Sequence, residues 1–168
     1  MFRGRFEHTI DSKGRISIPA RFREILAEKY DERVMITNFD RCLVAYPYEE
    51  WKNLEEKISS LSMVKKEARS FQRFFISAAV ECPIDKLGRI LIPPTLRSYA
   101  QLERDVVFSG MLKKFEIWSK ERFLEVIHEA AGRAVAHVRE TGSPFFLVLD
   151  TYRFSPHSKG DDVRDPAE

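Results

Sequence analysis

The chain has 168 residues, 43% of them hydrophobic and 32% charged, with a formal net charge of +2 at neutral pH. This apolar content supports a folded core and excludes a wholly disordered chain, and so small a net charge does not by itself indicate a nucleic-acid partner. Cys42 and Cys82 lack metal-ligand or disulfide-framework spacing, and no apolar stretch approaches the roughly 18 residues of a membrane span. We therefore expect a cytoplasmic protein without a membrane span.

The first 18 residues predict a β-hairpin. Residues 5–10 and 15–18 alternate polar and apolar side chains, as half-buried strands do. The intervening sequence Asp11-Ser-Lys-Gly14 is typical of a tight turn, because Asp can accept hydrogen bonds from the turn and Gly tolerates a positive φ. Pro19 then predicts the first residue of a helix.

The next elements are a second hairpin and two helices. Residues 33–37 and 42–46 read as paired strands around a four-residue turn, and Pro47 predicts the start of a helix. Residues 63–79 predict another helix whose aromatic side chains we interpret as core packing, not as a platform for stacking bases. These aromatic residues are Phe71, Phe74 and Phe75.

The same pattern then occurs a second time. Residues 8–23 read HTIDSKGRISIPARFR and residues 82–97 read CPIDKLGRILIPPTLR. An internal repeat of this length predicts two copies of one supersecondary unit. Residues 80–84, 89–92, 106–109 and 115–118 repeat the strands, and Ser119 predicts the N-cap of a last helix that ends near residue 140.

We therefore expect a first repeat over residues 1–62, a linking helix over 63–79, a second repeat over 80–128 and a C-terminal extension over 129–168. Residues 145–149 form an apolar run that predicts an added strand or an oligomer contact. From residue 155 onward the chain is polar, which predicts disorder.

The repeated Asp-x-x-x-Arg turns are the candidate functional sites. An arginine can donate two hydrogen bonds to guanine or to a phosphate, whereas the structural alternative is a plain turn with a surface Asp–Arg pair of little energetic value. The duplication favours function. We expect DNA contacts from Arg3, Lys13, Gly14, Arg15, Lys86 and Arg89, and turn shaping by Asp11, Asp85 and Gly88.

Catalytic and metal motifs are missing from the sequence. It contains no H-E-x-x-H, G-x-S-x-G or G-x-x-x-x-G-K-[ST] pattern. We therefore expect neither an enzyme nor a bound metal, cofactor or small-molecule substrate.

Several motifs together resemble the MraZ family of bacterial transcriptional regulators over roughly residues 1–128. They are MFRG (1–4), HTIDSKGR (8–15), YPYEEW (46–51), RFF (73–75), IDKLGRILIP (84–93) and FEIWSK (115–120). The resemblance implies an α+β fold of two tandem SpoVT-AbrB-like, swapped-hairpin units that form a pseudo-dimeric β-barrel with flanking helices. It also implies a ring-shaped homo-oligomer on the nucleoid.

The resemblance further implies a repressor that binds repeated boxes of double-stranded promoter DNA in the cell-division and cell-wall gene cluster. In that hypothesis Arg15 and Lys13 contact DNA, Arg3 assists through phosphates, and Gly14 lets the DNA backbone approach closely. An alternative hypothesis is a ring-forming, protein-binding module without DNA contact, as in antitoxins of the same fold. The two differ in whether promoter boxes are preferred.

Overall fold

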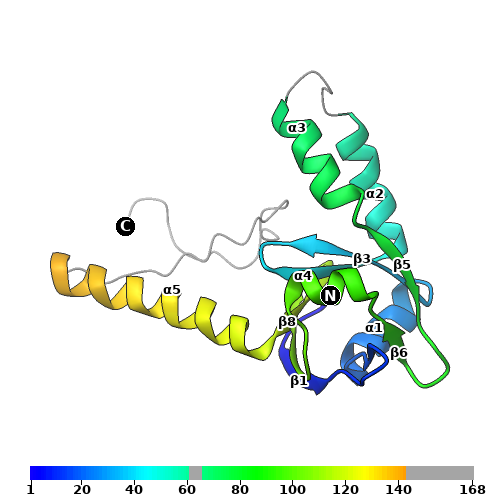
Figure 1. The fold of residues 1–168 in the computed structure, drawn as a ribbon, viewed down its shortest axis with the longest axis horizontal. Coiled ribbons are helices and arrows are strands. Elements are labelled where there is room, and N and C mark those ends of the chain that lie inside the picture. The colour runs from blue at the N-terminus through cyan, green and yellow to red at the C-terminus, as the bar shows by residue number, and fades with distance from the viewer. Residues whose placement is uncertain (61–65, 143–168) are drawn as a thin grey trace, which may run out of the picture. The chain divides into compact units, whose positions relative to one another are not determined.

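In the parts of the chain that the computed structural model describes, residues 1–60 and 66–142, the backbone forms two antiparallel sheets and flanking helices (Figure 1). The chain divides into two units, Met1–Glu125 and Val126–Glu168. The elements follow in chain order: β1 (Arg5–Thr9), β2 (Arg15–Ser17), α1 (Ala20–Lys29), β3 (Arg33–Phe39), β4 (Cys42–Pro47), α2 (Tyr48–Ser59), α3 (Lys66–Phe71), the π-helix η1 (Gln72–Ile76), β5 (Val80–Pro83), β6 (Arg89–Leu91), α4 (Pro94–Ala100), β7 (Asp105–Met111), β8 (Lys114–Ser119) and α5 (Lys120–Thr141).

The six-stranded sheet shows that the repeats exchange strands. Its order is β1-β7-β8-β4-β3-β5, so β1 of the first repeat pairs with β7 of the second, and β5 of the second pairs with β3 of the first. The repeats also meet at its centre, where β4 pairs with β8. The predicted α+β fold with exchanged hairpins is confirmed, and neither repeat can complete its part of the sheet alone.

The prediction of a closed barrel is wrong. Strands β2 and β6 contain three residues each and pair with each other in a separate two-stranded sheet. An isolated antiparallel β-bridge between Ile10 and Ile16 links this small sheet to the end of β1. Strands this short cannot supply a continuous ladder between β1 and β5, so the larger sheet stays open at those two edges.

Pro19 and Pro47 were predicted to be the first residues of their helices, but each lies one position before the first helical residue. Pro19 has φ −50° and ψ 137°, and Pro47 has φ −53° and ψ 145°. Their ψ values are extended, so each proline occupies the N-cap position and its helix begins at the following residue. Proline fixes φ but not ψ, which is why the sequence locates the start of each helix only to within a residue.

The linking segment is only partly the helix that was predicted. Its described portion is α3 followed by the π-helical turn η1, and residues 63–65 lie outside the described residues. Phe75 is buried and stacks on Trp51 with ring centroids 5.6 Å apart, as expected for core packing. Phe74 is 41% exposed and Phe71 is 36% exposed, so the interpretation of the aromatic stripe as core is wrong at these two residues.

The main core lies between the repeats. Phe2 and Phe22 come from the first repeat, and Phe108 and Phe115 from the second; all four side chains are fully buried. The Phe22 ring lies 5.2 Å from both the Phe2 and Phe115 rings, measured between centroids. Each repeat is too short to bury a large core by itself, and this shared aromatic cluster compensates for that.

The last described helix has the predicted boundaries. The Arg122 amide donates to Ser119 Oγ at 3.2 Å, which confirms Ser119 as the N-cap. Helix α5 ends at Thr141, and Gly142 follows with φ 64°, the conformation that glycine commonly adopts after a helix. No helix among the described residues is long and apolar enough to cross a membrane. The predicted apolar strand at 145–149 and the predicted disorder from 155 lie outside the described residues.

Candidate nucleic-acid interface

The first Asp-x-x-x-Arg turn is organised by its own aspartate. Asp11 Oδ1 accepts hydrogen bonds from the backbone amides of Lys13 and Arg15, both at 2.9 Å. Asp11 Oδ2 accepts a third from Arg15 Nε at 2.8 Å. Gly14 completes the turn with φ 85°, and its amide donates to the Asp11 carbonyl. A glycine is favoured there because other residues rarely adopt a positive φ.

The second turn repeats this geometry. Asp85 Oδ1 accepts from the amides of Leu87 and Arg89 at 2.9 Å, and Oδ2 accepts from Arg89 Nε at 2.9 Å. Gly88 has φ 72°. The turn-shaping that the sequence predicts for Asp11, Asp85 and Gly88 therefore has a direct geometric basis, and each arginine is oriented by a carboxylate four residues before it.

These hydrogen bonds stabilise the ionised aspartates. The Arg15 amide, and secondly the Arg15 side chain, lower the pKa of Asp11 below its usual 3.8, although desolvation opposes the shift. The Arg89 amide lowers the pKa of Asp85 in the same way. At neutral pH both carboxylates are therefore charged and hold their arginines in place.

The lowered pKa predicts how stability depends on pH. Because the folded protein favours the charged form of Asp11, the contribution of this group is present above its unfolded pKa and is lost as pH falls through its folded pKa. Asp11→Asn should therefore melt below the wild type at about pH 6, with the difference shrinking towards about pH 3. Thermal melts across this range test the expectation. Asp105→Asn, at an exposed aspartate outside the turns, is the control. A difference in melting temperature between Asp11→Asn and the wild type that did not change with pH would contradict the prediction.

The two arginines share the exposed face of the β2–β6 ribbon. In its register Arg15 lies opposite Leu91 and Ser17 lies opposite Arg89, so these four side chains lie on one face. Arg15 and Arg89 are diagonal neighbours, about 7–8 Å apart at their Cα atoms. The other face carries the buried Ile16 and Ile90. The ribbon thus presents two guanidinium groups on one face, each oriented by the turn at its own end of the ribbon.

Of the remaining residues predicted to contact DNA, only some lie exposed on the turns. Lys13 and Lys86 are exposed on the two turns, as a phosphate contact requires. Gly14 is buried, so its Cα faces the protein interior. Arg3 is exposed but precedes β1, whereas the first turn follows that strand. Strand β1 spans about 13 Å between the Cα atoms of Arg5 and Thr9, so Arg3 lies at the opposite end of this strand from the first turn.

Sequence reasoning missed two arginines that lie against the turns. Arg97 packs against Gly14, and Arg23 packs against Gly88. The signal was present in the repeat, since Arg23 and Arg97 occupy equivalent positions. Ser17 and Leu91 were also missed, although strand alternation would place them on the same face as the two turn arginines.

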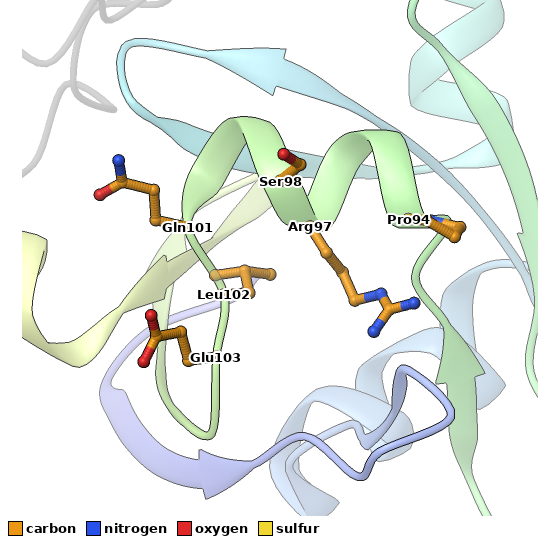
Figure 2. Close-up of a pocket in the computed structure, with 6 residues that line it drawn as sticks. All are labelled: Pro94, Arg97, Ser98, Gln101, Leu102 and Glu103. Atoms are coloured by element: carbon orange, nitrogen blue, oxygen red, sulfur yellow. The ribbon is translucent and has the colours of Figure 1, made fainter.

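A shallow hollow lies beside α4 (Figure 2). It has a volume of about 570 Å³ and is open to solvent, unlike the enclosed apolar clefts that bury most of a small ligand. Six residues line it: Pro94, Arg97, Ser98, Gln101, Leu102 and Glu103. No cluster of potential metal ligands occurs within residues 1–60 and 66–142.

Comparison with known proteins gives a consistent assignment. The family model described as "MraZ protein, putative antitoxin-like" matches the chain twice, over residues 1–74 and 75–142. The "Transcriptional regulator MraZ" of Caldanaerobacter subterraneus subsp. tengcongensis is 55% identical over 121 residues, which cover 72% of this chain and 82% of that protein. Its namesake from Heliobacterium modesticaldum is 50% identical over 131 residues, covering 78% and 90%. That of Desulfitobacterium hafniense strain Y51 is 48% identical over 130 residues, covering 77% and 89%.

Proposed function

This chain belongs to the MraZ family of transcriptional regulators, and from that premise we propose that it binds promoter DNA through the exposed face of the β2–β6 ribbon. The observation that carries the proposal is the pair Arg15 and Arg89, adjacent on that face and each oriented by an aspartate. A surface ion pair of this kind adds little stability, so stability alone does not account for two copies of it.

The ribbon suits the major groove in shape and chemistry. That groove is about 12 Å wide and admits a two-stranded β-ribbon, and three residues of strand extend about 10 Å. The Arg15 side chain donates its Nε–H to Asp11 Oδ2 and makes no other hydrogen bond within the described residues. Its terminal N–H groups therefore remain to donate to guanine O6 and N7, which is the commonest specific contact in protein–DNA complexes.

The turns around the ribbon supply the phosphate contacts. Lys13 and Lys86 are exposed beside the arginines, and lysine binds phosphate as a point charge. Asp11 and Asp85 shape the turns and do not contact DNA directly, because a carboxylate facing the DNA backbone would repel the phosphates. Arg3 would meet phosphates only outside the footprint of this ribbon. The role of Gly14 in this proposal is to shape the first turn.

One ribbon offers few base contacts, so we infer that several act together. Linked binding sites raise one another's effective concentration. A ring of protomers on the nucleoid would present ribbons at fixed spacing and would select DNA with boxes at a matching repeat. The family resemblance supports a target in the cell-division and cell-wall gene cluster and a repressing role.

A gel-shift titration with the full chain tests the proposal. The probe is the duplex upstream of the protein's own gene, and the control is a shuffled duplex of equal length and composition. We expect the promoter duplex to bind more tightly and a footprint to show repeated protected boxes. Equal affinity for both duplexes would refute sequence-specific binding.

Binding should weaken steeply with salt. Each neutralised phosphate contributes about −0.9 to the slope of log affinity against log salt, so several ribbons give a slope of several units. Lys13→Gln should reduce that slope by about 0.9 for each engaged first turn while leaving the preference for promoter DNA unchanged. Titrations at four or more salt concentrations measure both slopes. A flat salt dependence of the wild type would contradict the electrostatic part of the proposal.

One observation favours a second function. Leu87 is 66% exposed on the second turn and Leu91 is 56% exposed on the ribbon face, and large exposed apolar side chains are typical of protein-binding surfaces. A protein-binding module would bind its partner through these leucines and would show weak, sequence-independent binding to DNA. The same gel-shift comparison separates the two functions.

A further inference from the structure

Each Asp-x-x-x-Arg turn is in contact with an arginine from the opposite repeat. A Cβ built on Gly14 would lie 2.8 Å from both Nε and Cζ of Arg97, so the guanidinium lies directly against the first turn. A Cβ on Gly88 would lie 2.5 Å from Cδ and Nη1 of Arg23. Figure 2 shows the Arg97 side chain extending from α4 toward the segment that joins β1 and β2.

Backbone hydrogen bonds cross between the repeats at the same places. The Ile92 amide donates to the Gly14 carbonyl at 2.8 Å, and the Ile18 amide donates to the Gly88 carbonyl at 3.0 Å. Each turn is therefore supported by the other repeat twice, by a backbone hydrogen bond and by an arginine. Any shift of α4 relative to β2 would move the first turn.

Stability alone does not account for arginine at position 97. Arg97 Nε is buried and has no hydrogen-bond partner among the described residues, and a buried unsatisfied donor is destabilising. The nearby Asp11 carboxylate is already engaged with Arg15. A leucine or methionine would fill much of the space without burying an unpartnered N–H group. The guanidinium contributes something else: a rigid, planar surface against the Cα of Gly14.

We propose that Arg97 and Arg23 are positioning residues for DNA binding, each setting the turn of the opposite repeat and thereby fixing Arg15 and Arg89 relative to each other. This inference rests on the proposed DNA-binding function. Two arginines that read neighbouring bases must keep their separation, and support from the opposite repeat holds it more firmly than support from within each turn. Neither positioning residue is required to touch DNA.

Amide hydrogen exchange of the DNA-free protein tests the crossed support. In Arg97→Gln, exchange should accelerate at Gly14 and Ile92, whose hydrogen bonds involve the first turn, and should stay unchanged at Gly88 and Ile18. Arg23→Gln should give the opposite pattern. Faster exchange at the turn of the mutated residue's own repeat, or no change at either turn, would overturn the inference.

Binding measurements test the consequence for DNA. Arg97→Gln and Arg97→Lys should both lower the ratio of promoter to shuffled-duplex affinity, by about tenfold, which lies within the range of coupling between contacting residues. The salt slope should not change, because no phosphate contact is lost. Arg133→Gln, at an exposed arginine of α5, is the charge-matched control and should keep the wild-type ratio.

The outcomes separate three explanations. If Arg97 contacted phosphate, Arg97→Lys would restore binding and Arg97→Gln would reduce the salt slope, which would overturn the positioning role. If it only stabilised the fold, the melting temperature would fall with an unchanged affinity ratio, which would also overturn it. Arg23→Gln provides the same test at an exposed position if Arg97→Gln does not fold. If the wild type shows no promoter preference, the proposed function fails, and hydrogen exchange still decides the crossed support.

Discussion

Arg15→Ala should remove the preference for promoter DNA and leave the protein folded. Losing a bidentate contact to guanine costs about 1–3 kcal/mol of discrimination, and every ribbon engaged on the same DNA loses it at once. Two engaged ribbons would lose about 2–6 kcal/mol of the roughly 4–10 kcal/mol that separates specific from non-specific binding. Gel-shift titration against the promoter and shuffled duplexes measures this loss.

The fold should tolerate this change because Arg15 lies on the exposed ribbon face. Its side chain is 36% exposed and pairs with an aspartate of similar exposure, and such pairs contribute about 0–1 kcal/mol. A thermal melt checks that the variant is folded. Arg133→Ala removes an exposed arginine far along the chain and should bind like the wild type. If folded Arg15→Ala kept near-wild-type affinity for the promoter duplex, Arg15 would not be the base-reading residue.

The local geometry of the turns follows from the sequence. Asp at the first position, Gly at the fourth and Arg at the fifth determine which hydrogen bonds form within five residues, so both turns have the predicted shape. The contacts of Arg23 and Arg97 could not be predicted in this way. They depend on α1 and α4 packing across to the opposite repeat, and a helical arginine four residues after a proline looks like an ordinary surface residue.

The exchange of strands was available only through the family resemblance. Alternating polarity identifies β1 and β5 as strands, but it does not say that β1 pairs with β7 instead of β3. Barrel closure was expected from the same resemblance, and alternating polarity could not correct it, because alternation does not report that β2 and β6 form a sheet separate from the larger one. The π-helical turn η1 was missed for a related reason: its hydrophobic period over five residues is indistinguishable from that of an α-helix.

Phe22→Ala should destabilise both repeats together. Phe22 is fully buried between Phe2 and Phe115, which belong to different repeats. Truncating a buried phenylalanine typically costs about 3–5 kcal/mol, because the transfer free energy is lost and a cavity remains. Denaturant unfolding should therefore show a lower midpoint with an unchanged slope.

The shape of that transition tests whether the repeats form one cooperative core. Since β1 and β5 are exchanged and the aromatic cluster is shared, Phe22→Ala should unfold in a single step when followed by tryptophan fluorescence and by circular dichroism. Phe74→Ala is the matched control, because its ring is 41% exposed and should cost less than about 2 kcal/mol. A biphasic transition in Phe22→Ala, with one half of the sheet surviving the other, would mean that the repeats have separate cores. The crossed support of the two turns could not then persist when either repeat unfolds, because each turn depends on hydrogen bonds and an arginine that the other repeat supplies.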